Sequence, residues 1–314
     1  MDLSILAGLG FSQARQVQGR ASIADLFKPS QRCGIYVLHF SNGALYAGQA
    51  VDVTRRYAQH RVKYKDIEKI SFRQVPSVHL NDEERTVIWT LEQEGQVLRN
   101  NTFASIPKGE SDFDLVMPPE EQARWLEDLS YVDNEGDRLI NPALRRRYHD
   151  RFQSLLDMPY ANVALDVLKT YARVGIPAGR RGEVSFWACS CLPKRNTYSR
   201  INIYWQETLT AFTHKNELWF SLHVADSPFV RMTDQALKRL FERHPAAVAV
   251  DHQYNPGGPD QVSLEIPAEA AEAFIKEPEV LSAIRLFNLR LMQKGPCTYG
   301  RYHCMDLADI LLFD

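Results

Sequence analysis

The first hundred residues contain basic, acidic and phenolic side chains of the types that could hydrolyse a phosphodiester bond. Tyr36 and Tyr46 lie ten residues apart, and Arg56 and His60 follow at the spacing of one helical turn. A guanidinium can hold a phosphate through two hydrogen bonds. The carboxylate of Glu84 could hold one hard divalent cation, Mg²⁺ or Mn²⁺. Because imidazole and phenol groups can carry protons, these side chains together predict a site of phosphodiester hydrolysis.

The two tyrosines are predicted to lie on the two arms of a β-hairpin. The runs 34–40 and 44–48 are rich in apolar, aromatic and β-branched residues, and Asn42-Gly43 lies between them. Asn-Gly is typical of tight hairpin turns because both residues tolerate positive φ. Gly48 ends the second run, where the hairpin leads into the next segment, and would allow a close approach of the backbone.

A basic helix is predicted after this hairpin, from Asp52 to about Lys69. The residues predicted to share one of its faces are Arg56, His60 and Lys63. The segment 55–65 contains five Lys or Arg and no Asp or Glu, although the whole chain has a net charge of −2. We expect this local patch to contact nucleic acid, through Arg55, Arg61 and Lys65. A solvated helix face is the alternative interpretation.

A third strand and a second helix are predicted next. The strand covers about 71–78, and the helix begins near Asn81 and stops at Gly95. Glu84 would lie in the first turn of this helix. It therefore also fits a capping box, in which its carboxylate would accept a hydrogen bond from the backbone N–H of Asn81.

The order of these motifs resembles the GIY-YIG nuclease family over about residues 32–103. The matching residues are Gly34-Ile35-Tyr36, Tyr46-Ala47-Gly48, Arg56, His60, Glu84 and Asn100. Ala47 stands where the family usually has Ile or Val. The resemblance implies a small sheet of three antiparallel strands flanked by helices.

The resemblance also implies a role for each residue of the motif. Glu84 would ligate Mg²⁺ or Mn²⁺, and Arg56 would stabilise charge on the scissile phosphate. Tyr36 would act as or near the general base for water, with His60 assisting. A phenol with its ordinary pKa of ~10 is a poor base at neutral pH, so nearby cationic groups such as Arg56, or a metal-bound water, must help it. Tyr46 would complete the catalytic residues by positioning water or phosphate through its hydroxyl. The supporting residues would be Gly34, Gly48, Lys63 and Asn100.

The remainder of the chain predicts an α+β protein with several parts. We expect an N-terminal helical extension (1–30), the nuclease-like domain (31–105), a connector with helices (106–160) and a second α+β domain (161–314). In that last domain, strands are expected over 184–191, 201–212 and 218–224, with a further hairpin turning at 256–259. Arg145 and Arg146, in the second connector helix, are candidates for contact with a nucleic-acid backbone.

Composition limits the cellular setting. The 314 residues include five cysteines, a small and odd number that argues against a disulfide scaffold and fits a reducing cytoplasm. No apolar run is long enough to cross a bilayer, so no membrane partner is expected. Whether Cys189, Cys191, Cys297 and Cys304 bind zinc is left open by their spacing.

These observations predict a cytoplasmic, metal-dependent endonuclease, acting on DNA rather than RNA, in a restriction or phage-defence setting. The second domain would recognise a target, sense a trigger or form a homodimer or a contact with a partner protein. One alternative is a structure-specific nuclease of DNA repair or recombination. Another is a catalytically idle nucleic-acid-binding subunit of a larger assembly.

Overall fold

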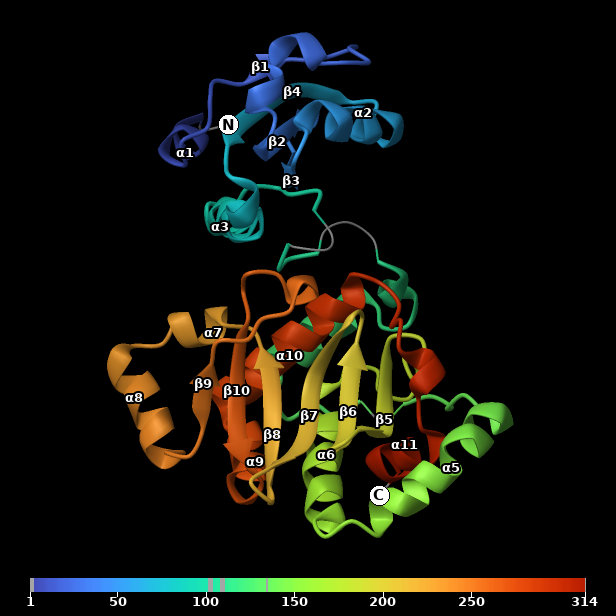
Figure 1. The fold of residues 1–314 in the computed structure, drawn as a ribbon. Helices are drawn as coiled ribbons and strands as arrows, with labels where there is room; N and C mark the ends of the chain where they lie inside the picture. Colours follow the sequence, from blue (N-terminus) through green and yellow to red (C-terminus); the bar gives the residue numbers. More distant parts are fainter. Residues whose placement is uncertain (1–2, 101–103, 108–110, 134, 314) are drawn as a thin grey trace. The chain divides into compact units, whose positions relative to one another are not determined.

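The apolar segments of the chain form two separate antiparallel sheets, each with its own helices (Figure 1). The computed structural model describes residues 3–100, 104–107, 111–133 and 135–313. The chain divides into an N-terminal unit, residues 1–108, and a C-terminal unit, residues 109–314. The predicted α+β class is confirmed. No helix in the described ranges is long and apolar enough to cross a bilayer.

The N-terminal unit contains a sheet of four strands rather than the expected three. Its order is β1-β4-β2-β3, and every neighbouring pair is antiparallel. The strands are β1 (Arg15–Gln16), β2 (Gly34–Phe40), β3 (Leu45–Ala50) and β4 (Ile67–Gln74). The additional strand, β1, pairs with β4 through Arg15 and Gln16. The helices are α1 (Leu3–Gly8), α2 (Val53–Lys63) and α3 (Leu80–Gln93).

The N-terminal segment is not the predicted helical extension. After the short α1, the described part of residues 9–30 contains β1 and the 3-10 turns η1 (Ala24–Leu26) and η2 (Pro29–Gln31). Val17 and Ile23 are fully buried. The hydroxyl of Tyr57 donates to the carbonyl of Val17 at 3.0 Å. These apolar residues therefore pack on the four-stranded sheet as an irregular segment instead of forming a helix.

The boundary between α2 and β4 also differs from the prediction. The helix ends at Lys63, because Tyr64 is extended (φ −108°, ψ 115°), and β4 begins at Ile67. Ile67, Ile70 and Phe72 are buried against the sheet. Their burial favours a strand in a region where local composition favoured helix.

The C-terminal unit is built on a six-stranded sheet of order β5-β6-β7-β8-β10-β9. Its strands are β5 (Trp187–Lys194), β6 (Thr197–Ile203), β7 (Gln206–His214), β8 (Glu217–Val224), β9 (Val248–Val250) and β10 (Val262–Pro267). The predicted strand 201–212 is thus two strands, because Tyr204 turns the chain with φ of +55°. The hairpin predicted at 256–259 is confirmed as the connection between β9 and β10.

Helices cover one face of this sheet. They include α6 (Ala161–Gly175), α9 (Ala268–Lys276) and α10 (Pro278–Gln293), and Figure 1 draws β6, β7 and β8 in front of α10. The predicted inward face of β8 is confirmed, since Leu218, Phe220, Leu222 and Val224 are all buried in the core. Trp219, Ser221 and His223 alternate with them and therefore point to the opposite face. The remaining helices are α4 (Pro119–Glu127), α5 (Pro142–Leu156), α7 (Ser227–Val230), α8 (Asp234–Arg243) and α11 (Met305–Leu312).

The segment expected to be a connector belongs to the C-terminal unit. Its two helices, α4 and α5, are present as predicted, but Trp125 and Leu155 are fully buried in the core of this unit. The buried guanidinium of Arg285 donates to the carbonyls of Trp125 (2.7 Å) and Tyr131 (2.8 Å). It thereby fixes this segment to α10. Residues 108–110 and 134 of the expected connector lie outside the described residues.

Candidate active site in the N-terminal unit

The two tyrosines lie side by side on β2 and β3, as the hairpin motif predicts. Tyr36 is opposite Gly48 and Leu38 is opposite Tyr46 in the register of the two strands. The tyrosine rings stack at a centroid distance of 6.3 Å with an interplanar angle of 22°. The turn at Gly43 has φ of +80°, which explains the requirement for glycine there.

Two glycines of the hairpin leave room for close contacts within the site. A Cβ at Gly48 would lie 2.5 Å from the Tyr36 hydroxyl and 2.6 Å from Cζ of the same ring. Gly48 lies within β3 and not at the junction with the basic helix, so the close approach it allows is to a tyrosine side chain. A Cβ at Gly34 would lie 2.1 Å from the carbonyl oxygen of Arg73 on β4. The two glycines support the site by leaving room for Tyr36 and for β4.

Helix α2 carries the basic residues of the site. Its start is fixed by Asp52, whose carboxylate accepts a hydrogen bond from the backbone N–H of Thr54 at 2.9 Å. This start turns His60 toward the sheet, and its Nε2 lies 2.7 Å from the Tyr36 hydroxyl. The ring of His60 also lies 4.6 Å from that of Tyr46. The expected proximity of Tyr36 and His60 is therefore present in the structure, and Tyr46 lies beside the same imidazole.

The burial of these groups shifts their proton affinities. Burial raises the pKa of both phenols, while the nearby guanidinium of Arg56 opposes this shift for each of them. Burial lowers the pKa of His60 to about 4, and the charges of Arg56 and Lys63 contribute to the lowering. His60 is therefore a neutral imidazole at pH 7, and its Nε2 can accept the hydrogen bond of the Tyr36 hydroxyl.

Glu84 is a buried carboxylate on α3, with 4% of its surface exposed. The capping-box alternative is wrong, because His79 occupies the N-cap position and no side chain caps this helix. Burial raises the pKa of Glu84 to about 7, although hydrogen bonds with the side chain and backbone of Gln49 act in the opposite direction. Arg56 is near enough to lower this pKa as well. One guanidinium thus acts electrostatically on the two phenols and on the carboxylate.

Asn100 holds the strand that carries Tyr46. Its side-chain amide donates to the carbonyl of Ala47 at 2.6 Å and accepts from the Ala47 N–H at 3.0 Å. The neighbouring segment continues this pairing, since the N–H of Leu45 donates to the carbonyl of Val97 and the N–H of Arg99 donates to the carbonyl of Leu45. Asn100 therefore supports β3, and its role is one of positioning.

Two residues of the site were not anticipated from the sequence. Gln49 contacts Glu84, and its side chain also donates to Asn81 at 2.6 Å. The ring of Tyr64 lies 6.0 Å from that of His60, nearly parallel at 17°. Tyr64 follows His60 by four residues, which is a detectable helical spacing, whereas no local pattern marks Gln49.

Among the remaining basic residues of the segment 55–65, Arg61 is half-buried and the others are exposed. The side chain of Arg55 is 87% exposed, with Asp52 at 3.9 Å. The guanidinium of Arg61 donates to the carbonyl of Lys65, and the Lys63 ammonium lies 5.0 Å from the centroid of Tyr64. These cations leave the prediction of a nucleic-acid contact open.

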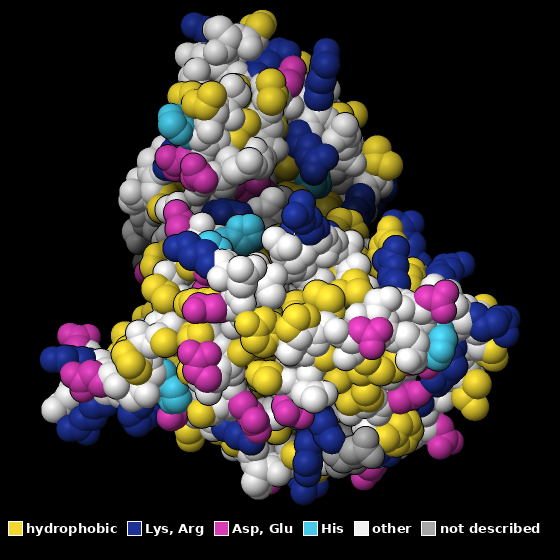
Figure 2. Space-filling model, turned by 60° about the horizontal axis from the view of Figure 1, so that its bottom comes forward, with side chains coloured by type: hydrophobic (Ala, Val, Ile, Leu, Met, Phe, Trp, Pro, Cys, Tyr) yellow, Lys and Arg dark blue, Asp and Glu magenta, His cyan; other side chains and the backbone are white. Residues whose placement is uncertain are grey.

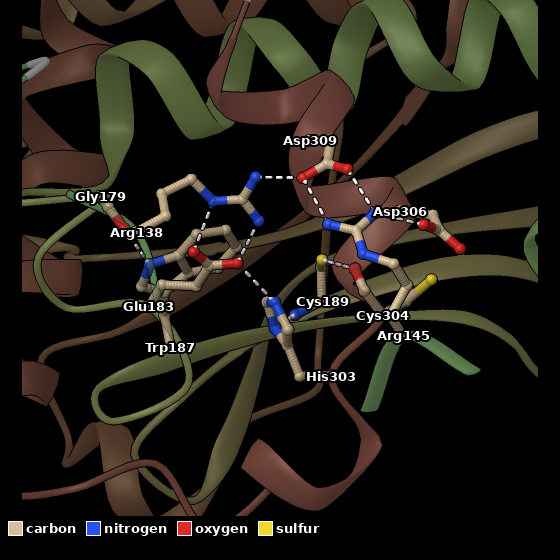
Figure 3. A network of polar contacts seen from close by, with 10 residues as sticks. All are labelled: Arg138, Arg145, Gly179, Glu183, Trp187, Cys189, His303, Cys304, Asp306 and Asp309. Atoms are coloured by element: carbon tan, nitrogen blue, oxygen red, sulfur yellow. Dashed lines mark hydrogen bonds and ion pairs between the residues drawn. The ribbon is translucent and has the colours of Figure 1, made fainter. Parts of the chain in front are cut away.

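Arg145 and Arg146 are placed differently. Arg145 forms ion pairs with Asp306 and Asp309, and so joins a network that includes Arg138 and the buried Glu183 (Figure 3). Its charge is therefore already paired within the C-terminal unit. Arg146, the next residue of α5, is exposed.

The cysteines do not form a zinc site among the described residues. In that part of the chain no group of three or more His, Cys, Asp or Glu side chains could hold a metal ion. Cys189 donates its backbone N–H to Nδ1 of His303, and the other nitrogen of this ring contacts Glu183 at 2.8 Å (Figure 3). The imidazole is therefore occupied by structural hydrogen bonds.

Comparisons with protein-family models, curated proteins and solved structures find no match to this chain. The resemblance to GIY-YIG nucleases accordingly depends on the motif residues themselves.

Proposed function

We propose that the N-terminal unit hydrolyses phosphodiester bonds in nucleic acid, and specifically in DNA, with one divalent cation held by Glu84. The observation that carries this proposal is the hydrogen bond of 2.7 Å between the Tyr36 hydroxyl and His60, next to Arg56 and a buried carboxylate. Such a group can activate water, hold a phosphate and bind a cation within one small region.

The chemistry of Glu84 fits a divalent cation. None of the ion pairs among the described residues includes this buried carboxylate, and its pKa of about 7 reflects the cost of burying its charge. A cation beside it would restore a low pKa. Mg²⁺ keeps several waters and needs only one or two protein carboxylates, so a single glutamate suffices. The cation would offset negative charge that develops on the phosphate.

The phenol and the imidazole supply a path for one proton. Because His60 is neutral at pH 7, its Nε2 can accept the proton of the Tyr36 hydroxyl while that hydroxyl oxygen takes a proton from an attacking water. Burial disfavours a free phenolate at Tyr36, so the two transfers are expected to occur together. The positive charge of Arg56 lowers the free-energy cost of negative charge on Tyr36. Its guanidinium can also donate two hydrogen bonds to the phosphate.

The experiment is cleavage of supercoiled plasmid and of single-stranded DNA and RNA in Mg²⁺ or Mn²⁺. The variant is Glu84→Gln, which keeps the shape of the side chain. Its matched control is Asp82→Asn, which removes an exposed carboxylate from the same helix. We expect metal-dependent cleavage of DNA by the wild type and the control, and a loss of 100-fold or more in Glu84→Gln.

Equal cleavage by all three proteins would show that Glu84 has no catalytic role. Absence of cleavage in the wild type on every substrate would refute the hydrolase and favour an idle binding subunit.

A further inference from the structure

A groove of about 240 Å³ lies on the six-stranded sheet, on the face opposite the core-facing side chains of β8. We call it the sheet groove. Its floor includes the hydroxyl side chains of Thr210 and Ser221, which are directly opposite each other on β7 and β8. The volume is below the ~300–1,000 Å³ of typical small-molecule pockets. It therefore suits a ligand that lies along the sheet and is only partly enclosed.

One end of the sheet groove is positively charged. Lys194 ends β5 and Arg195 begins the turn to β6. Both are exposed, and neither has a side-chain partner among the described residues. Arg200 lies further along β6 and pairs with Glu207 at 2.8 Å. Glu207 is the one carboxylate among the lining residues, and it also accepts a hydrogen bond from Tyr254 at 3.2 Å. Three cations against one satisfied carboxylate leave a net positive lining.

The other end of the sheet groove is a cluster of rings. The ring of Tyr254 lies 5.0 Å from that of His223 and 4.7 Å from that of His252. His223 is buried, and its Nδ1 is held by the hydroxyl of Ser263 at 2.7 Å. His252 is exposed and Tyr254 is half-buried. The buried member therefore fixes the cluster, while the other two can present ring surface to a ligand.

The spacing of the two ends suits a nucleotide chain. Phe212, which lines the cationic end, is opposite Trp219 on β8, and His223 follows on that strand four residues later. At ~3.4 Å per residue, the two ends are about 14 Å apart along the direction of the strands. Proteins that bind single strands combine cations that follow the backbone with aromatic rings on which bases stack. The sheet groove has both components, the cations at one end and the rings at the other.

We propose that the sheet groove binds a short single-stranded segment of nucleic acid, with phosphates at Lys194 and Arg195 and a base against Tyr254 and His252. The proposal rests on the proposed nuclease function, for which this segment would be part of the substrate. A duplex would need a broad basic surface and offers no free base faces. On the face of the molecule drawn in Figure 2, Lys and Arg side chains lie among Asp and Glu side chains.

The test measures binding of fluorescein-labelled 12-nucleotide single strands of DNA and RNA by fluorescence anisotropy. The full chain with Glu84→Gln is used, so that cleavage does not consume the probe. Further changes are Lys194→Ala with Arg195→Ala, and separately Tyr254→Ala and Tyr254→Phe. The matched control is Lys238→Ala with Arg239→Ala, two exposed cations of α8. Thermal melting of each variant checks that it is folded.

We expect removal of Lys194 and Arg195 to weaken binding and to reduce the slope of log affinity against log salt by about 1.4, that is ~0.7 for each lost phosphate contact. Tyr254→Ala should weaken binding about five-fold or more, while Tyr254→Phe keeps the ring and should bind nearly as well as the parent. The α8 control should retain most of the affinity. Single strands carrying 4-thiouracil should crosslink to the peptide that contains Tyr254.

An unchanged salt slope in the double variant, or crosslinks confined to other segments, would overturn the proposal. Equal binding of the corresponding duplex, or full competition by free mononucleotide at the concentration of the strand, would also overturn it. Plasmid cleavage by the parent chain with Glu84 intact is measured in parallel. If the chain with Glu84 cleaves plasmid but the groove variants bind single strands normally, the groove proposal is rejected and the nuclease proposal stands. If the groove variants bind less tightly but the chain with Glu84 does not cleave, the nuclease proposal is rejected and the groove proposal stands.

Discussion

Replacing Glu84 with glutamine should make the metal-free N-terminal unit more stable at alkaline pH. Glu84 is buried, and its pKa in the folded protein is raised from 4.5 to about 7. The folded state therefore holds a proton more tightly than the unfolded state. A group of this kind adds stability below its unfolded pKa and loses that contribution as pH rises through the folded value.

The expected magnitude follows from the size of the shift. One pKa unit corresponds to about 1.4 kcal/mol, so the stability advantage of Glu84→Gln should grow by about 2.5 kcal/mol between pH 5 and pH 8. His60 has the opposite dependence, because its folded pKa of about 4 lies below its ordinary 6.5. Its contribution is lost as pH falls from 6.5 to 4. The pH profile of the wild type mixes the two effects, whereas the difference between the two proteins isolates Glu84.

The assay must report the N-terminal unit separately. Both proteins are equilibrated in EDTA with increasing urea at pH 5, 6, 7 and 8, and are then labelled by a brief pulse of hydrogen exchange at one common pH. Mass spectrometry of peptides from β2 and α3 gives the unfolding midpoint of this unit at each condition. Asp82→Asn is the matched control and should follow the wild type at every pH.

A difference in stability that stays constant from pH 5 to pH 8 would refute the reasoning, because it would mean that Glu84 ionises as readily in the folded chain as in the unfolded one. A second measurement at pH 8 adds Mg²⁺. The cation should stabilise the wild type in proportion to RT ln(1 + [Mg²⁺]/Kd) and leave Glu84→Gln unchanged. Equal stabilisation of both proteins would place the cation elsewhere.

Three further changes test the geometry of the site. Gly48→Ala places a Cβ against the Tyr36 hydroxyl. It should therefore destabilise the unit by about 1–3 kcal/mol in urea and reduce plasmid cleavage at least ten-fold. A variant that cleaves plasmid as fast as the wild type would contradict this packing. Asn100→Ala removes both hydrogen bonds to Ala47 and should cost about 2 kcal/mol in the same urea assay, whereas a cost near zero would mean that water replaces the amide. In an NMR titration of the metal-free protein, the imidazole of His60 should protonate with a midpoint near pH 4; a midpoint near 6.5 would show that the ring is exposed.

The parts of the fold that could be predicted are those encoded by short segments. The Asn42-Gly43 turn and its flanking apolar runs predict β2 and β3 correctly, and the alternation of Leu218, Phe220 and Leu222 predicts the buried face of β8. In each case neighbours in the sequence determine the structure, through a turn conformation or a period of two.

Features that depend on distant contacts could not be predicted in this way. Residues 9–30 contain apolar residues that suggest a helix, but burial of Ile23 in the core of the four-stranded sheet fixes an irregular path. The contact of Gln49 with Glu84 depends on the approach of α3 to β3, which no local pattern records. Arg145 is predicted as a free cation because its partners, Asp306 and Asp309, lie some 160 residues away in sequence.

The pairing along β3 has a consequence for association between chains. An edge strand normally leaves outward N–H and C=O groups free to recruit another strand. Here Leu45 bonds with the 97–99 segment, Ala47 bonds with the side chain of Asn100, and the backbone of Gln49 bonds with Glu84. The side chains that build the site therefore also cover this sheet edge. A mutation that removes their hydrogen bonds to β3 should expose an edge that can pair with strands of other molecules and cause aggregation.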